Sequence, residues 1–200
     1  MIRMTGNKYT YLAILAIVFI SGMLIGVAMD NGHDEGVNND TIYQYSTISS
    51  LMQGVFDGDM SIGDIKGYGD AGLGTFNALD GEMVVLDGTV YQIRYDGAVL
   101  VTGDDVKTPF ACVTSFEKDI VMDVEGPYSM EDLELRILDA LPSENLAYVI
   151  RVDGNFEHMR TRSPRPQQTP YPDLVTALED QSIFEFEDIG GTVIGFWSPA

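Results

Sequence analysis

The sequence predicts an α+β protein with two mixed-sheet halves. Patterns typical of helices are followed by patterns typical of strands in two successive regions, 42–124 and from 129 onward. In the first region, Asp-Gly pairs divide short apolar runs, and such pairs suit hairpin turns because both residues tolerate positive φ. With 200 residues and 45% hydrophobic content, the chain can bury the cores that this fold needs.

The N-terminal part has the pattern of an exported chain. Arg3 and Lys8 precede an uncharged apolar run from Tyr9 to Met29, and acidic residues follow it. This order predicts that residues 1–29 form a membrane anchor or a cleaved signal peptide, with the folded body outside the cytoplasm. Residues 30–40 are polar and are expected to form a flexible tether. Both alternatives give an extracytoplasmic protein, either membrane-anchored or secreted.

The first domain is expected over residues 41–128 and should begin with two helices. Apolar residues recur at helical spacing from Ile42 to Val55, where Gly54 weakens the pattern, and a second short helix is expected over Ser61–Lys66. Strands are then expected as an antiparallel meander over 83–101 and as single strands over 111–116 and 120–124.

The second domain is expected over residues 129–200. Ser129 and Asp132 approximate a capping box and Pro142 ends an apolar face, so a helix is predicted from Ser129 to Leu141. Four prolines between Ser163 and Pro172 predict an extended loop of fixed shape. The other expected elements are a short helix from Pro172 to Leu178 and strands over 147–152, 183–186 and 192–197.

Charge and cysteine content exclude several classes of function. The chain has 11 basic and 31 acidic residues, and its net charge of -20 repels phosphate backbones, which argues against nucleic-acid binding. Cys112 is the only cysteine, so an intramolecular disulfide and a cysteine metal cluster are excluded. Its apolar neighbours indicate a buried structural thiol. A two-carboxylate glycosidase remains a formal alternative, but no pair of carboxylates stands out.

The glycine-rich segment Gly69–Met83 is the first candidate site. Its glycines allow the backbone to approach something small, and the segment carries Thr75 and Glu82. A plain connection into the meander explains the same residues. The pattern is not a dinucleotide fingerprint, because strand signals follow it where that motif needs a helix.

Two further features could carry chemistry. In the segment His158–Arg162, Arg160 and Arg162 share one face of an extended chain. They could bind a carboxylate there, or they could be surface residues that offset part of the excess negative charge. Asp104 and Asp105 could bind calcium weakly, but a solvated loop fits their spacing better.

Several segments together resemble the acetolactate decarboxylase family and occur in its order. They are Tyr43–Thr47, Gly69–Asn77, Asp80–Met83, Thr161–Arg162, Pro170–Pro172 and Gly191–Trp197. The resemblance covers nearly the whole chain after the tether, and the ordered set is highly specific. It implies a two-domain α+β carbon-carbon lyase, usually a homodimer, that converts 2-acetolactate to acetoin and carbon dioxide.

The resemblance also implies roles for four residues. Arg162 would bind the substrate carboxylate, and Glu82 would move protons at the reacting carbon or hydroxyl. Thr75 would line the pocket, and Leu79 would pack on the methyl side of the substrate. Loss of carbon dioxide next to a ketone leaves an enediolate, so such a site must also stabilise negative oxygen.

The family implies a zinc ion held by three histidines, which follow the strand that ends at Trp197. This chain has two histidines, His33 in the tether and His158, so no metal ligands are expected within it. The family's ligands would lie beyond Ala200, and the second domain would be truncated. Two interpretations stay open: a metal-assisted decarboxylase, with the activity of this 200-residue chain itself left open, and a non-catalytic exported binding domain with the same fold.

Overall fold

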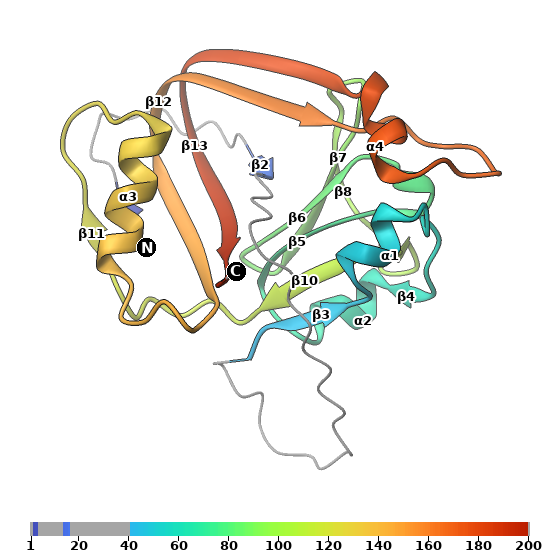
Figure 1. Cartoon of the computed structure of the whole chain (residues 1–200), viewed down its shortest axis with the longest axis horizontal. Coiled ribbons are helices and arrows are strands. Elements are labelled where there is room, and N and C mark those ends of the chain that lie inside the picture. The colour runs from blue at the N-terminus through green and yellow to red at the C-terminus, as the bar shows by residue number, and fades with distance from the viewer. Residues whose placement is uncertain (1, 4–13, 17–40, 200) are drawn as a thin grey trace.

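The computed structural model describes residues 2–3, 14–16 and 41–199. Strands dominate the fold, and the helices are few and short. Two main sheets lie side by side (Figure 1) and pack on each other through an apolar cluster that contains Leu73 and Val84 from one sheet and Ile194 from the other. The overall α+β class is thus present, with strands as its larger component.

The six-stranded sheet is built from residues 43–114 and has the order β3-β10-β5-β6-β7-β8. Its strands are β3 (Tyr43–Tyr45), β5 (Ala71–Thr75), β6 (Glu82–Leu86), β7 (Thr89–Ile93), β8 (Val99–Val101) and β10 (Ala111–Thr114). Every ladder in it is antiparallel, so the expectation of a mixed sheet is wrong for this half. The physical reason is that tight turns reverse the chain between successive strands.

The expected meander is confirmed. Asp87 and Gly88 join β6 to β7 with φ values of 50° and 73°, which is the positive-φ pair that a two-residue hairpin turn requires. A separate small ladder pairs β4 (Met60–Ser61) with β9 (Lys107–Thr108).

The five-stranded sheet is mixed and has the order β11-β1-β12-β13-β2. Its strands are β1 (Ile2–Arg3), β2 (Ile14–Ala16), β11 (Met122–Asp123), β12 (Tyr148–Ser163) and β13 (Ser182–Trp197). The antiparallel pair β12 and β13 is its centre, and β1 and β2 add parallel ladders on either side.

Both long strands correct the predicted boundaries. β12 continues past Val152 to Ser163, and β13 is one strand where two were expected, over 183–186 and 192–197. Gly154 pairs with Gly191, so residues that resemble turn signals lie opposite each other inside one ladder. Because the two glycines lie opposite each other, the two strands stay paired at this point.

The helices are α1 (Ile48–Met52), α2 (Ile62–Lys66), α3 (Met130–Ala140) and α4 (Leu174–Ala177), with 3-10 turns η1 (Asn77–Leu79) and η2 (Leu178–Asp180). The predicted helices at Ser61 and Ser129 are confirmed, and both serines cap them through a side-chain oxygen. The helix expected from Ile42 is wrong at its start, because Tyr43–Tyr45 pairs with β10 as β3 and the helix begins after Thr47. Asp173 caps α4, so Pro172 lies just outside it.

Strand alternation decides which residues face the second sheet. Met83 and Val85 pack with Ile65 beneath the six-stranded sheet, whereas Leu73 and Val84 point to the five-stranded sheet. A polar link joins the sheets at the far end of β6: the Arg151 Nη1 donates to Asp87 Oδ1 over 2.7 Å, and the Arg151 Nε donates to Asp153.

Several N-terminal predictions lie outside the described residues. They include the tether over 30–40 and the apolar run from Tyr9 to Met29, apart from Ile14–Ala16 in β2. Among the described residues, no helix is long and apolar enough to cross a membrane. The domain boundary after residue 128 stays a prediction. β11 precedes this boundary and joins the five-stranded sheet.

Candidate active site

Thr75 and Glu82 lie opposite each other where the ladder of β5 and β6 ends. Thr75 lies two residues from Leu73 on β5, and Glu82 lies two residues from Val84 on β6. Side chains two residues apart share one face of a strand, so both face the five-stranded sheet. The glycine-rich segment thus delivers a hydroxyl and a carboxyl side by side to the face between the two sheets.

Glu82 is a half-buried carboxyl with an altered acidity. Burial raises its pKa from the ordinary value of 4.5 to about 7, and the charge of Arg162 acts in the opposite direction. The carboxyl therefore exchanges its proton near neutral pH, which is the property of a general acid or base.

Arg162 comes to this place from the other sheet, as part of the long strand β12. It lies near the end of β12, which extends to β7 and β8 (Figure 1). The next residue, the fully buried Ser163, donates its hydroxyl to the carbonyl oxygen of Ile93 over 2.9 Å. Ile93 is the cross-strand partner of Glu82, so this one bond fixes the end of β12 beside the carboxyl.

The charge of Arg162 acts on the Glu82 carboxyl through space. Among the ion pairs of the described residues, none joins these two side chains. The Arg162 side chain is exposed, and its charge still lowers the pKa of Glu82. A guanidinium held near a protonatable carboxyl, without being neutralised by it, is suited to attract a small carboxylate.

Thr75 has a defined structural task. Its buried hydroxyl donates to the carbonyl oxygen of Gly81 over 2.7 Å, and its own carbonyl accepts from the Thr108 hydroxyl over 2.7 Å. The hydroxyl proton is therefore engaged in holding the residue that precedes Glu82. The oxygen of Thr75 keeps lone pairs with which it could accept a further hydrogen bond.

The turn before Glu82 carries unusual backbone angles. Ala78 and Leu79 have φ values of 60° and 57°, which is rare for residues with a side chain. The turn is held from outside, because the Ala78 N–H donates to the Phe56 carbonyl over 2.8 Å and the Ala78 carbonyl accepts from the Gln167 N–H over 2.7 Å. The proline loop is therefore bonded directly to the turn that leads to Glu82.

Leu79 lies in an apolar cluster and is 2% exposed. The cluster consists of Leu51, Phe56, Leu79, Phe110, Leu174 and Ala177. Its position anchors the turn before Glu82 against α1 and α4. Contact between Leu79 and the methyl side of a substrate stays a prediction.

The other sequence candidates lie away from Glu82 or are otherwise engaged. His158 is exposed within β12 opposite Glu187, and Arg160 pairs with Glu185 over 3.8 Å. Asp104 pairs with Lys66 over 2.6 Å. Burial raises the pKa of Cys112 to about 12, so this thiol stays protonated and is a poor nucleophile.

The described residues do not fit the implied zinc site. Within residues 2–3, 14–16 and 41–199, no three His, Cys, Asp or Glu side chains gather closely enough to hold a metal ion. His33 lies outside this part of the chain.

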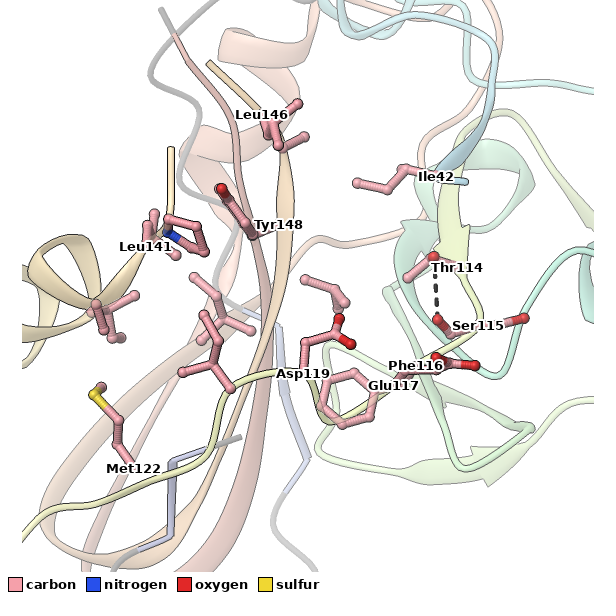
Figure 2. A pocket seen from close by; sticks show the side chains of 17 residues that line it. Ile42, Thr114, Ser115, Phe116, Glu117, Asp119, Met122, Leu141, Leu146 and Tyr148 are labelled. Carbon is pink, nitrogen blue, oxygen red and sulfur yellow. Dashed lines mark hydrogen bonds between the residues drawn. The ribbon is translucent and has the colours of Figure 1, made fainter. Parts of the chain in front are cut away.

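Two cavities lie elsewhere. One, of about 820 Å³, is lined by the end of α3, the start of β12 and the segment after β10 (Figure 2). Figure 2 shows Leu146, Tyr148 and Asp119 around it. The other, of about 310 Å³, lies between α3 and the pair β12 and β13 and includes His158 and Arg160. Neither is lined by Glu82 or Arg162.

Sequence reasoning missed the residues that hold the site together. Ser163 and Gln167 bond the second half of the chain to Ile93 and Ala78, beside Glu82. Ser163 follows Arg162 directly, but a serine at a strand end carries no local signal of such a bond. Only the pairing of distant strands reveals it.

These features define a class of protein: a strand-rich α+β fold whose site holds a carboxyl with a pKa of about 7 beside an arginine. Such a site can transfer a proton next to a bound anionic group. Comparisons narrow this class: a family model for alpha-acetolactate decarboxylase matches residues 42–200. The chain belongs to the alpha-acetolactate decarboxylase family.

Individual relatives agree with this assignment. The chain is 45% identical over 161 residues to the alpha-acetolactate decarboxylase of Methanosarcina mazei, covering 80% of this chain and 56% of that one. It is 44% identical over 163 residues to that of Bacillus licheniformis, with coverages of 81% and 64%. The crystal structure of alpha-acetolactate decarboxylase from Bacillus subtilis strain 168 matches with a TM-score of 0.78 at 43% identity, over 80% of this chain and 68% of that one. The chain thus spans 56% and 64% of the length of the two relatives compared by sequence.

Proposed function

We propose that this chain takes part in the decarboxylation of 2-acetolactate to acetoin and carbon dioxide. The observation that most directly supports this proposal is the half-buried Glu82, whose carboxyl has a pKa of about 7 beside Arg162. The substrate is inferred from the relatives, which are named alpha-acetolactate decarboxylases. Zinc stays a family-level expectation, and the described residues contribute no step through it.

The proposed reaction consists of one bond cleavage followed by one proton transfer. The bond between the carboxylate and its carbon breaks, carbon dioxide leaves, and the electron pair remains as an enediolate. Protonated Glu82 then gives its proton to the carbon that lost the carboxylate, which yields acetoin, and the carboxylate of Glu82 regains a proton from water. Arg162 holds the substrate carboxylate before it leaves.

The test is acetoin release from racemic 2-acetolactate by this chain, measured with and without added zinc. Glu82→Gln should lower turnover by about 10²-fold or more, since proton transfer by a positioned group typically contributes that much. Arg162→Ala should mainly raise KM. The matched controls are Glu185→Gln and Arg160→Ala, because these two side chains pair with each other across β13 and β12 and are more than half exposed.

The outcomes separate the two interpretations of the chain. Equal turnover in Glu82→Gln and Glu185→Gln would overturn the role of Glu82. Without acetoin release in either metal condition, the decarboxylase proposal fails for this chain. Retained binding of 2-acetolactate, lost in Arg162→Ala, would then support the non-catalytic binding domain.

We also propose that the folded body lies outside the cytoplasm, anchored or secreted. The support is the order of charges around the apolar run from Tyr9 to Met29. A phosphatase that works only outside the cytoplasm, fused after Ala200, should be active. Activity only of a cytoplasmic reporter at the same position would contradict this topology.

A further inference from the structure

Glu82 follows a joint in the chain that requires glycine. Gly81 has a φ of 86°, and a Cβ at this position would lie 2.3 Å from the carbonyl oxygen of Ile93 on β7. The positive φ and the close backbone both suit glycine alone. Glycine also has the greatest backbone freedom of all residues, so bonds from other residues must give the start of β6 one fixed direction.

Two peptide planes meet at this joint, and each carries one carbonyl group. The Asp80 carbonyl lies in the plane before the Gly81 Cα, and the Gly81 carbonyl lies in the plane between Gly81 and Glu82. Because a peptide group is planar, a bond that holds its carbonyl restrains the whole plane. When both planes are held, the two backbone rotations of Gly81 are fixed, and Glu82 enters β6 in one orientation.

A side chain holds each of these two carbonyl groups. The Thr75 hydroxyl donates to the Gly81 carbonyl over 2.7 Å. The Gln92 Nε2 donates to the Asp80 carbonyl over 2.6 Å. Thr75 lies opposite Glu82 and shares its face of the sheet, whereas Gln92 is one residue away from the position opposite Glu82 on β7 and so points to the other face. The joint is therefore held from both faces.

Arg94 also reaches Asp80 from β7, but it contacts the side chain. Its Nε donates to Asp80 Oδ1 over 3.2 Å. Rotatable bonds join this carboxylate to the backbone, so the contact leaves the peptide plane free to turn. Gln92 is therefore the residue of β7 that holds the peptide group itself. Both Gln92 and Asp80 are half-buried, which limits the competition of water for this bond.

We propose that Gln92 is a positioning residue for Glu82 and acts through the carbonyl of Asp80. Without this bond the peptide plane before Gly81 can turn, and the Glu82 carboxyl occupies several orientations. A proton donor must lie within hydrogen-bond reach of the atom it serves, and a displacement of about 1 Å can lower turnover by about 10²-fold. The effect on turnover rests on the proposed function, but the orientation of the carboxyl can be tested without substrate.

Gln92→Met tests this role, because methionine keeps the length of the side chain and removes the N–H donor. At a temperature where the variant is folded, kcat for 2-acetolactate should fall about tenfold or more, while KM stays within about twofold. The NMR signal of the labelled Glu82 carboxyl carbon should also move. The matched control is Gln44→Met, which removes a similar bond of 2.9 Å to the Ser46 carbonyl at the opposite edge of the same sheet. It should change neither kcat nor the Glu82 signal.

The two measurements keep this inference separate from the proposed function. If the parent releases acetoin, an unchanged kcat in Gln92→Met, or equal effects of Gln92→Met and Gln44→Met, would overturn the positioning role. If the parent releases none, the proposed function fails, and the Glu82 signal alone decides the positioning role. A signal that moves in Gln92→Met and not in Gln44→Met supports it, and a signal that stays unchanged in Gln92→Met overturns it.

Discussion

The charge of Arg162 lowers the pKa of Glu82, while burial raises it, and burial prevails to leave the pKa at about 7. The two residues come from different sheets and are held together by the bond between Ser163 and the carbonyl of Ile93. The acidity of the carboxyl thus depends on how the two sheets meet, and it can be measured without any substrate.

Removing the guanidinium should raise the pKa of Glu82 above about 7, because only the effect of burial would remain. The change is Arg162→Gln, and the measurement is a titration of the labelled glutamate carboxyl by NMR. Arg160→Gln is the control, since Arg160 pairs with Glu185 and does not act on Glu82. A Glu82 pKa that stays the same in Arg162→Gln would show that the guanidinium does not reach the carboxyl.

Glu82→Gln should stabilise the protein at alkaline pH. The pKa of Glu82 lies near 7 in the folded state and near 4.5 when unfolded, so the unfolded chain loses this proton first and stability falls as pH rises between these values. At pH 8 the variant should be more stable than the parent by up to roughly 3 kcal/mol, and near pH 4 the difference should vanish.

Urea unfolding at both pH values measures this difference. Glu185→Gln serves as the control, because it makes the same carboxylate-to-amide change at a side chain that is more than half exposed. An equal effect of Glu82→Gln at pH 4 and pH 8 would show that the carboxyl titrates normally.

Thr75→Val should destabilise the fold by about 1–2 kcal/mol, because it removes the hydroxyl that bonds the Gly81 carbonyl in a buried place. Thr102→Val is a matched control: in the described structure the buried Thr102 hydroxyl has no hydrogen-bond partner. That change should be neutral or stabilising. Equal losses in urea unfolding for the two variants would contradict the structural role of the Thr75 hydroxyl.

Gly74→Ala should destabilise strongly, by at least about 3 kcal/mol or to the point of unfolding. A Cβ at Gly74 would lie 2.4 Å from the Phe110 carbonyl oxygen, and the backbone of β10 cannot move away without breaking its ladder. Gly103→Ala is the control, because nothing lies within 4 Å of its Cβ. Thermal unfolding of both variants should separate them clearly.

Local signals predicted much of the first half of the fold. Asp87 and Gly88 marked a hairpin, and Ser61 and Ser129 marked helix starts, because each of these residues acts on its own neighbours in sequence. Long-range pairing overrode local pattern elsewhere. Tyr43–Tyr45 has helical spacing but forms β3, since β10 offers it a full ladder.

The candidate site was predictable only in part. The segment Gly69–Met83 drew attention to Thr75 and Glu82, and strand register explains why they share a face. Resemblance to a family was needed to choose Arg162 over Arg160. The bond from Ser163 to Ile93 spans 70 positions in sequence, and no local pattern encodes a contact at that distance.

The six-stranded sheet is complete by residue 114, whereas Arg162 and Ser163 lie far downstream on β12. During synthesis, Glu82 can therefore be in place before the arginine has left the ribosome. Until β12 arrives and Ser163 reaches the Ile93 carbonyl, Glu82 lacks both the cover of the five-stranded sheet and the charge of Arg162. The order of translation thus places the approach of Arg162 to Glu82 after the synthesis of the six-stranded sheet.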